Sequence, residues 1–173
     1  MVDVEAIGAR ALEYDKYSGC SQSVLLALQE AFDIGDPESF RAATVLSGGV
    51  ARRGETCGAL LGGLMALGLV YGRDDIRDTQ AYRDAMRPAN EIVDEFKERL
   101  GEEFGFDEPL DSTICRDIQR RIYGRSFDLN DPEDYPLFIE VGGHEDDGCP
   151  KTCAIAAKVT AEKLMALMKE NSL

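Results

Sequence analysis

Cysteine is the residue type in this sequence that offers the most chemistry. The chain has five cysteines and a single histidine. A thiolate can attack an electrophile, exchange with a disulfide, or bind a soft metal such as iron or zinc. The chain contains no C-x-x-C pair and no C-x-x-C-H segment. A thioredoxin motif is therefore excluded, and no haem is expected. The five candidates are Cys20, Cys57, Cys115, Cys149 and Cys153.

Four of these cysteines stand where the sequence predicts that a helix begins. Cys20 follows a Ser-Gly break, and Cys57 follows a Gly-Glu-Thr segment. Cys115 falls in the first turn after an Asp-Ser-Thr cap, and Cys149 precedes a proline, which is favoured at the first helical position. A helix N-terminus has partial positive charge and unpaired N–H groups, and both stabilise a thiolate or an anionic cluster. We call Cys20, Cys57, Cys115 and Cys149 the helix-start cysteines, and we expect them to share one site.

Cys153 has a different setting from the other four. It lies four residues after Cys149, on the same face of the predicted last helix. A cysteine among apolar residues inside a helix usually packs in the core, because it is among the most buried residue types. We therefore expect Cys153 to pack, and a role as a substitute or additional metal ligand stays open.

Helices are the elements that must position these residues. Apolar residues recur at spacings of three and four along most of the chain, and no strand-like alternation is found. Residues 124–148 are polar and rich in Asp, Pro and Gly, which predicts a long loop before the last helix. The chain is predicted to be one all-α domain over residues 1–173, a compact multi-helix bundle. The predicted helices cover residues 4–14, 20–32, 40–46, 56–71, 78–100, 112–123 and 150–169, and Pro88 is expected to break or kink the fifth.

Small residues form a stripe along the fourth predicted helix. Gly58, Gly62 and Ala66 recur every four residues and so lie on one face. A glycine inside a helix is about 1 kcal/mol less favourable than alanine, which close approach of another backbone can offset. That second backbone belongs either to the same chain or to a second copy in a homodimer.

The net charge limits the partners that the protein can have. Lysine and arginine number 19 against 33 acidic residues, which leaves a formal charge of −14. Nucleic acids and anionic membranes attract basic surfaces, so neither is expected. The acidic charge is interpreted as a solvated surface that keeps the protein soluble, and docking of a basic redox protein is the alternative. The N-terminus lacks the features of a signal peptide, and the longest apolar stretch, residues 59–71, is too short to span a membrane. A cytoplasmic location is expected, where permanent disulfides are rare.

Two segments of the chain resemble a known family. Around Cys57 the sequence reads Thr-Cys-Gly-Ala-Leu-Leu-Gly, and around Cys20 it reads Tyr-Ser-Gly-Cys-Ser-Gln-Ser-Val. Both are similar to the signature of the C-GCAxxG-C-C family of redox-active proteins, and Cys115 and Cys149 fill its last two positions. The resemblance implies redox activity through these four cysteines. The family is similar to the non-haem, cysteine-bearing part of split-Soret cytochromes, which implies an iron–sulfur centre.

Other polar residues have simpler interpretations. His144 lies in a polar Gly-Gly-His-Glu-Asp-Asp segment, and we expect an exposed loop histidine rather than a metal ligand or proton shuttle. The acidic run at residues 145–147 lacks the spaced oxygen ligands of an EF-hand and is interpreted as solvated charge. Arg52 and Arg53 precede Cys57, and their charge would steady a thiolate or a cluster, with loop solubility as the alternative.

Three hypotheses for the function follow. In the first, the helix-start cysteines bind an iron–sulfur cluster, with [2Fe–2S] as the first choice, for electron transfer. In the second, the protein is a thiol–disulfide oxidoreductase with Cys57 as a nucleophile of lowered pKa. In the third, it is a zinc-bound or purely structural helical module that binds another protein. The sequence leaves open whether the chain is an enzyme and which protein is its redox partner.

Overall fold

The computed structural model describes residues 2–170, and in this range the regular elements are all helices, without a β-strand. The all-α prediction is confirmed. The only extended pairing among these residues is an isolated antiparallel bridge between Thr56 and Ile114. In chain order the helices are α1 (Val4–Asp15), α2 (Cys20–Phe32), α3 (Pro37–Ala42), the 3-10 helix η1 (Ala43–Leu46), α4 (Gly58–Tyr71), α5 (Thr79–Phe104), α6 (Cys115–Tyr123), α7 (Asp134–Glu140) and α8 (Cys149–Glu170).

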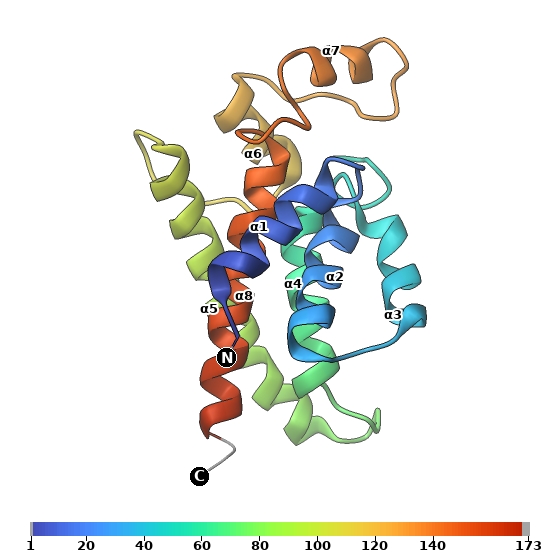
Figure 1. The fold of residues 1–173 in the computed structure, drawn as a ribbon, viewed down its shortest axis with the longest axis vertical. Helices are drawn as coiled ribbons and strands as arrows, with labels where there is room; N and C mark the ends of the chain where they lie inside the picture. The colour runs from blue at the N-terminus through green and yellow to red at the C-terminus, as the bar shows by residue number, and fades with distance from the viewer. Residues whose placement is uncertain (1, 171–173) are drawn as a thin grey trace.

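The long C-terminal helix α8 is the centre of the bundle. Helices α1, α2, α4 and α5 all pack against it, and it runs through the middle of the ribbon in Figure 1. Its first half is buried on nearly every side and consists mainly of small residues, including Ala154, Ala156 and Ala157. Small side chains let four helices approach one helix closely, so the core is built around α8.

The stripe of small residues on α4 packs within the chain. A Cβ atom added at Gly62 would collide with the backbone carbonyl of Ser21 on α2. On the adjoining face, a Cβ at Gly63 would collide with the Thr160 hydroxyl on α8. Glycine therefore allows α4 to fit between α2 and α8. Of the two predicted partners for the stripe, the structure shows a backbone of the same chain.

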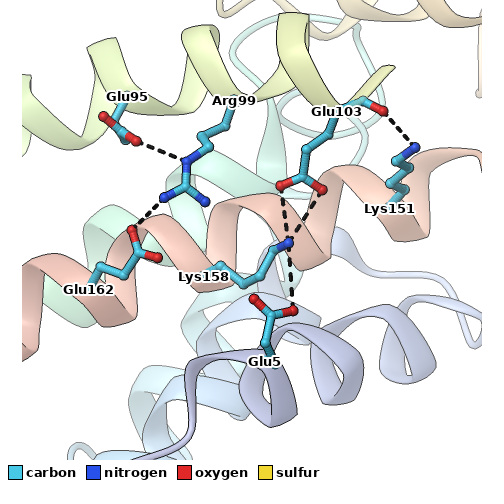
Figure 2. A network of polar contacts seen from close by, with 7 residues as sticks. All are labelled: Glu5, Glu95, Arg99, Glu103, Lys151, Lys158 and Glu162. Atoms are coloured by element: carbon cyan, nitrogen blue, oxygen red, sulfur yellow. Dashed lines mark hydrogen bonds and ion pairs between the residues drawn. The ribbon is translucent and has the colours of Figure 1, made fainter. Parts of the chain in front are cut away.

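Helix α5 is continuous through Pro88 and ends at Phe104, so the proline does not break it. Its apolar side chains Ile92, Phe96 and Leu100 enter the core at helical spacing. Beside them, polar side chains connect α5 to α8 (Figure 2): Arg99 Nη2 lies 2.8 Å from Glu162, and Lys158 Nζ lies 3.0 Å from Glu103. These polar contacts join the two helices, while the apolar residues supply most of the stabilisation.

The predicted long loop over residues 124–148 is wrong in part, because it contains helix α7 and packs closely. Phe127 and Phe138 are buried, with ring centroids 5.7 Å apart, and the Gln119 side chain accepts a hydrogen bond from the Phe127 backbone N–H. Because the segment is mostly polar, its sequence did not indicate that Phe127 and Phe138 are buried. The segment lies over one end of the bundle, at the top of Figure 1, and we call residues 125–148 the cover segment.

Candidate cysteine site

The four helix-start cysteines occupy the helix starts that the sequence predicted for them. Cys20, Cys115 and Cys149 are the first residues of α2, α6 and α8, and Cys57 is the N-cap of α4. Helix α6 begins later than the predicted residue 112, so Cys115 lies at its start rather than inside its first turn. All four are free thiols and line one cavity of about 60 Å³. Four remote sequence positions are thereby brought together.

A short backbone pairing holds Cys57 beside Cys115. The Cys57 N–H donates to the Thr113 carbonyl at 2.8 Å, and the Cys115 N–H donates to the Glu55 carbonyl at 2.6 Å. An ion pair between Arg116 and Glu55, at 2.6 Å, lies alongside. The two residues are 58 positions apart in the chain, so this alignment is a tertiary feature that local patterns do not reveal.

The loop before α4 has unusual backbone geometry. Residues 48–52 all have positive φ, between 54° and 69°, and so form a left-handed turn. Val50 is β-branched, and such residues rarely adopt this conformation, which is less favourable by about 1–2 kcal/mol per residue. Gly49 is required for a second reason, because a Cβ there would lie 2.7 Å from Cys115 Cβ. Strained backbone of this kind clusters at functional sites, and here it packs against the cysteines.

Cys20 and Cys149 are held by contacts from other elements. Cys20 Sγ packs on the start of α4, where a Cβ at Gly58 would lie only 2.5 Å from the sulfur. The Cys149 N–H donates to the Tyr123 hydroxyl at 2.9 Å, and that hydroxyl lies 3.6 Å from Cys149 Sγ. Sequence reasoning missed Tyr123, because nothing in its local pattern marks a contact with residue 149.

Cys153 is next to the cavity but does not line it. It is completely buried in the core, one turn into α8, and is not among the residues that line the cavity. Its sulfur is 3.9 Å from the Cys20 carbonyl oxygen. This placement agrees with the packing role expected for Cys153.

Burial raises the pKa of every thiol at this end of the molecule. It raises the pKa of Cys57 to about 11 and that of Cys149 to about 12. The backbone N–H groups of Ala59 and Leu60 lower the pKa of Cys57, as expected at a helix start, but burial has the larger effect. The lowered pKa predicted for Cys57 is therefore wrong for the metal-free protein. The pKa values of Cys20, Cys115 and Cys153 also lie well above the ordinary range, chiefly through burial.

Two acid–base groups in the cavity were not predicted as site residues. Asp15, the last residue of α1, is only 1% exposed, and neither carboxyl oxygen has a hydrogen-bond partner of normal geometry. Burial raises its pKa to about 7, and the nearby Cys153 thiol and Ser23 hydroxyl oppose that shift. Asp15 continues the four-residue spacing of Ile7 and Ala11, and this signal could have placed it on the buried face.

His144 also lines the cavity, so its predicted exposure in a loop is wrong. Its side chain is 21% exposed, and its Nδ1 lies 4.0 Å from Asp15 Oδ2. Burial is the main reason that its pKa is lowered. The ring packs edge-on against Phe138 with 5.4 Å between centroids, so the folded cover segment is what buries it.

The two arginines before Cys57 have different positions. Arg52 lines the cavity, donates to the Leu129 carbonyl at 3.3 Å, and lies 5.0 Å above the Tyr135 ring. It thereby fastens the cover segment to the left-handed turn. Arg53 is exposed and is not part of the lining. In the acidic run, Asp146 forms an ion pair with Lys16 at 2.9 Å.

The family model "Putative redox-active protein (C_GCAxxG_C_C)" matches residues 18–163. The chain belongs to this family. The matched range includes all five cysteines and most of the cavity lining. Searches of curated proteins and of solved structures gave no significant match.

Two absences apply to the described part of the chain. Among residues 2–170, no three His, Cys, Asp or Glu side chains are grouped so that they could hold a metal ion. No helix in the same range is long and apolar enough to cross a membrane.

Proposed function

We propose that this C-GCAxxG-C-C protein is an electron carrier whose four helix-start cysteines bind an iron–sulfur cluster, with [2Fe–2S] as the first candidate. One observation supports the proposal above all others: four free thiols from four different helix starts line a single cavity. A purely structural role would not require four remote segments to deliver the same reactive group to one place. Thiolates are the usual ligands of such clusters.

Burial of the thiols disfavours a free thiolate nucleophile in the cavity. Because burial raises the pKa of Cys57 and Cys149 to about 11 and about 12, the metal-free thiols are protonated at neutral pH. A thiol coordinated to a metal ion is deprotonated outright, because the ion supplies the missing positive charge. The same burial leaves little thiolate to attack a disulfide, so thiol–disulfide exchange ranks below cluster binding.

The residues of this chain would divide the work as follows. Cys20, Cys57, Cys115 and Cys149 would hold the cluster, which supplies one-electron redox chemistry when bound. Because no three such side chains among residues 2–170 are grouped closely enough to hold a metal ion, the four sulfurs would have to move closer together around it. The N–H groups at the start of α4 would offset the negative charge on Cys57. Leu129 and Phe138, from the cover segment, line the cavity and would limit water access. The acidic surface of the protein suits an electron-transfer partner with a basic face.

Anaerobic reconstitution tests the proposal. The wild-type protein is incubated with ferrous iron and sulfide, desalted, and analysed for iron, acid-labile sulfide, visible absorption and an electron paramagnetic resonance signal after reduction. We expect about two irons and two sulfides per chain for a [2Fe–2S] cluster, with one-electron reduction. Cys57→Ala should lose the cluster, whereas the matched variant Cys153→Ala should keep it.

Other results would point to the other hypotheses. If the protein is colourless and retains zinc, the proposal is wrong and the protein is a zinc-bound module. A protein that takes up neither metal, but loses two titratable thiols reversibly on mild oxidation, would be a thiol–disulfide oxidoreductase. Uptake of a cluster by Cys57→Ala at the wild-type level would overturn the assigned ligand set.

A further inference from the structure

The hydroxyl of Tyr123 makes two contacts with a single cysteine. Its oxygen accepts the backbone N–H of Cys149 at 2.9 Å, and it lies 3.6 Å from the sulfur of the same residue. Among residues 2–170 no other tyrosine hydroxyl has a hydrogen bond to a cysteine sulfur. Since the hydroxyl already accepts the N–H, its own proton is free to be donated.

Two acceptors compete for that proton. The Gly143 carbonyl lies 3.4 Å from the hydroxyl, which is longer than the usual O–H···O range of about 2.5–3.0 Å. The Cys149 sulfur is the larger and more polarisable acceptor, and it attracts the proton more strongly once it is a thiolate, because hydrogen bonds to charged acceptors are about twice as strong. A tyrosine hydroxyl is ordinarily protonated at neutral pH, so it is available as a donor.

The surrounding residues hold the tyrosine in this position. Its ring makes edge contacts with Phe127 and Phe138, with centroids 6.0 and 5.8 Å away. Gly148 leaves space for the hydroxyl, because a Cβ there would lie 2.7 Å from the Tyr123 oxygen. Tyr123 is the last residue of α6, and Cys115 is the first. One helix therefore supplies a cysteine at one end and the partner of a second cysteine at the other.

We propose that Tyr123 is a positioning residue that fixes Cys149 for the cluster and tunes the reduction potential through an O–H···S hydrogen bond to its sulfur. This inference rests on the proposed function. Hydrogen bonds to the ligand sulfurs are among the factors that set the potential of an iron–sulfur cluster. A donor withdraws electron density from the sulfur and makes the reduced state more favourable, so loss of the hydroxyl makes the potential more negative.

The test compares the reconstituted Tyr123→Phe protein with wild type. Dye-mediated titration, followed by electron paramagnetic resonance, measures the midpoint potential, and incubation with a chelator measures cluster retention. We expect a more negative potential in the variant, and retention weakened by about 10–100-fold, as for other residues that orient metal ligands. The matched control is Tyr14→Phe, which removes a hydroxyl bonded to Glu30 at 2.8 Å outside the cavity and should leave both properties unchanged.

The outcomes separate this inference from the proposed function. A loaded Tyr123→Phe protein with the wild-type potential overturns the tuning role and leaves cluster binding intact. A wild-type protein that takes up no cluster overturns both. If Tyr123→Phe does not load, wild-type protein made with 3-fluorotyrosine replaces it, because the more acidic hydroxyl donates a stronger hydrogen bond. The expected shift is then to a more positive potential, and no shift overturns the inference.

Discussion

The bundle core and the cysteine end of this molecule are built on opposite principles. In the core, Phe96, Leu100 and Ile155 are fully buried, and glycines admit close helix contacts. At the cysteine end the backbone runs through a left-handed turn at residues 48–52, and an unpaired carboxyl group, Asp15, is buried. Strain and buried polar groups persist only where the surrounding structure enforces them. The stability of the core therefore offsets the unfavourable backbone conformation and the buried carboxyl group at the cysteine end.

Helix α8 connects the two regions. It begins with Cys149 at the cavity and continues with Leu164 and Leu167 in the core. Because one rigid helix belongs to both, the position of Cys149 depends on core packing far from the cavity. The following experiments test whether stability is concentrated in the core and function at the cysteine end, from the largest expected effect to the smallest.

Truncation of a core side chain should have the largest effect on stability. Phe96→Ala removes a fully buried ring and should lower the free energy of unfolding by about 3–5 kcal/mol, because it loses apolar burial and leaves a cavity. Urea unfolding of the metal-free protein, followed by circular dichroism, measures the change. The matched variant Cys57→Ala, at the cavity, should cost much less, and an equal loss for both variants would contradict the division into two regions.

Asp15 should make the metal-free protein less stable as the pH rises. Its folded pKa of about 7 lies above the ordinary value of 3.8, so the folded state holds a proton that the unfolded state has released. Stability therefore falls between about pH 4 and pH 7, by up to about 4 kcal/mol, and the penalty is complete above pH 7.

The variant Asp15→Asn removes this titration. The difference in unfolding free energy between variant and wild type should grow in favour of the variant from pH 4 to pH 7, as measured by urea unfolding at several pH values. His144 is present in both proteins, so its own opposite trend largely cancels in the difference. If the difference in unfolding free energy does not change with pH, the pKa of Asp15 is not raised by burial in the folded protein.

Glycine positions on α4 should give effects of opposite sign. Gly62→Ala places a methyl group against the Ser21 carbonyl and should destabilise the protein by about 1–3 kcal/mol, through overpacking. Gly68→Ala, in the same helix, meets nothing within 4 Å and should stabilise it by up to about 1 kcal/mol, since alanine is the better helix former. Thermal unfolding compares the two variants. A stabilising Gly62→Ala would show that α2 and α4 are not in close contact.

The ion pairs between α5 and α8 should contribute least. Glu162→Gln breaks the contact with Arg99, and both side chains are partly exposed to solvent. Exposed ion pairs are worth about 0.2–1 kcal/mol and are screened by salt. We expect a loss below about 1 kcal/mol that shrinks further in 0.5 M sodium chloride, by urea unfolding. A larger loss of unfolding free energy that does not depend on salt would show that this contact stabilises the protein as much as core residues do.

Most of the helices could be predicted from local patterns, and the failures share one cause. The limits of α2 and the starts of α4 and α8 follow from breaks and apolar spacing near each helix. Helix α7 was missed because its two anchors, Phe127 and Phe138, stand in a polar segment and are buried only by residues distant in sequence. His144 was misassigned for the same reason, since the folded cover segment encloses it.

By itself, the sequence determined that the protein is all-α and that four cysteines begin four helices, because capping, breaks and hydrophobic spacing are local properties. Only the tertiary structure decided that these four thiols share a cavity, that burial reverses the pKa shift expected at a helix start, and that Tyr123 and Asp15 accompany them. Those features depend on contacts such as Cys57 with Thr113 and Tyr123 with Cys149. Such contacts join segments that no local pattern relates, and burial is a property of the whole fold.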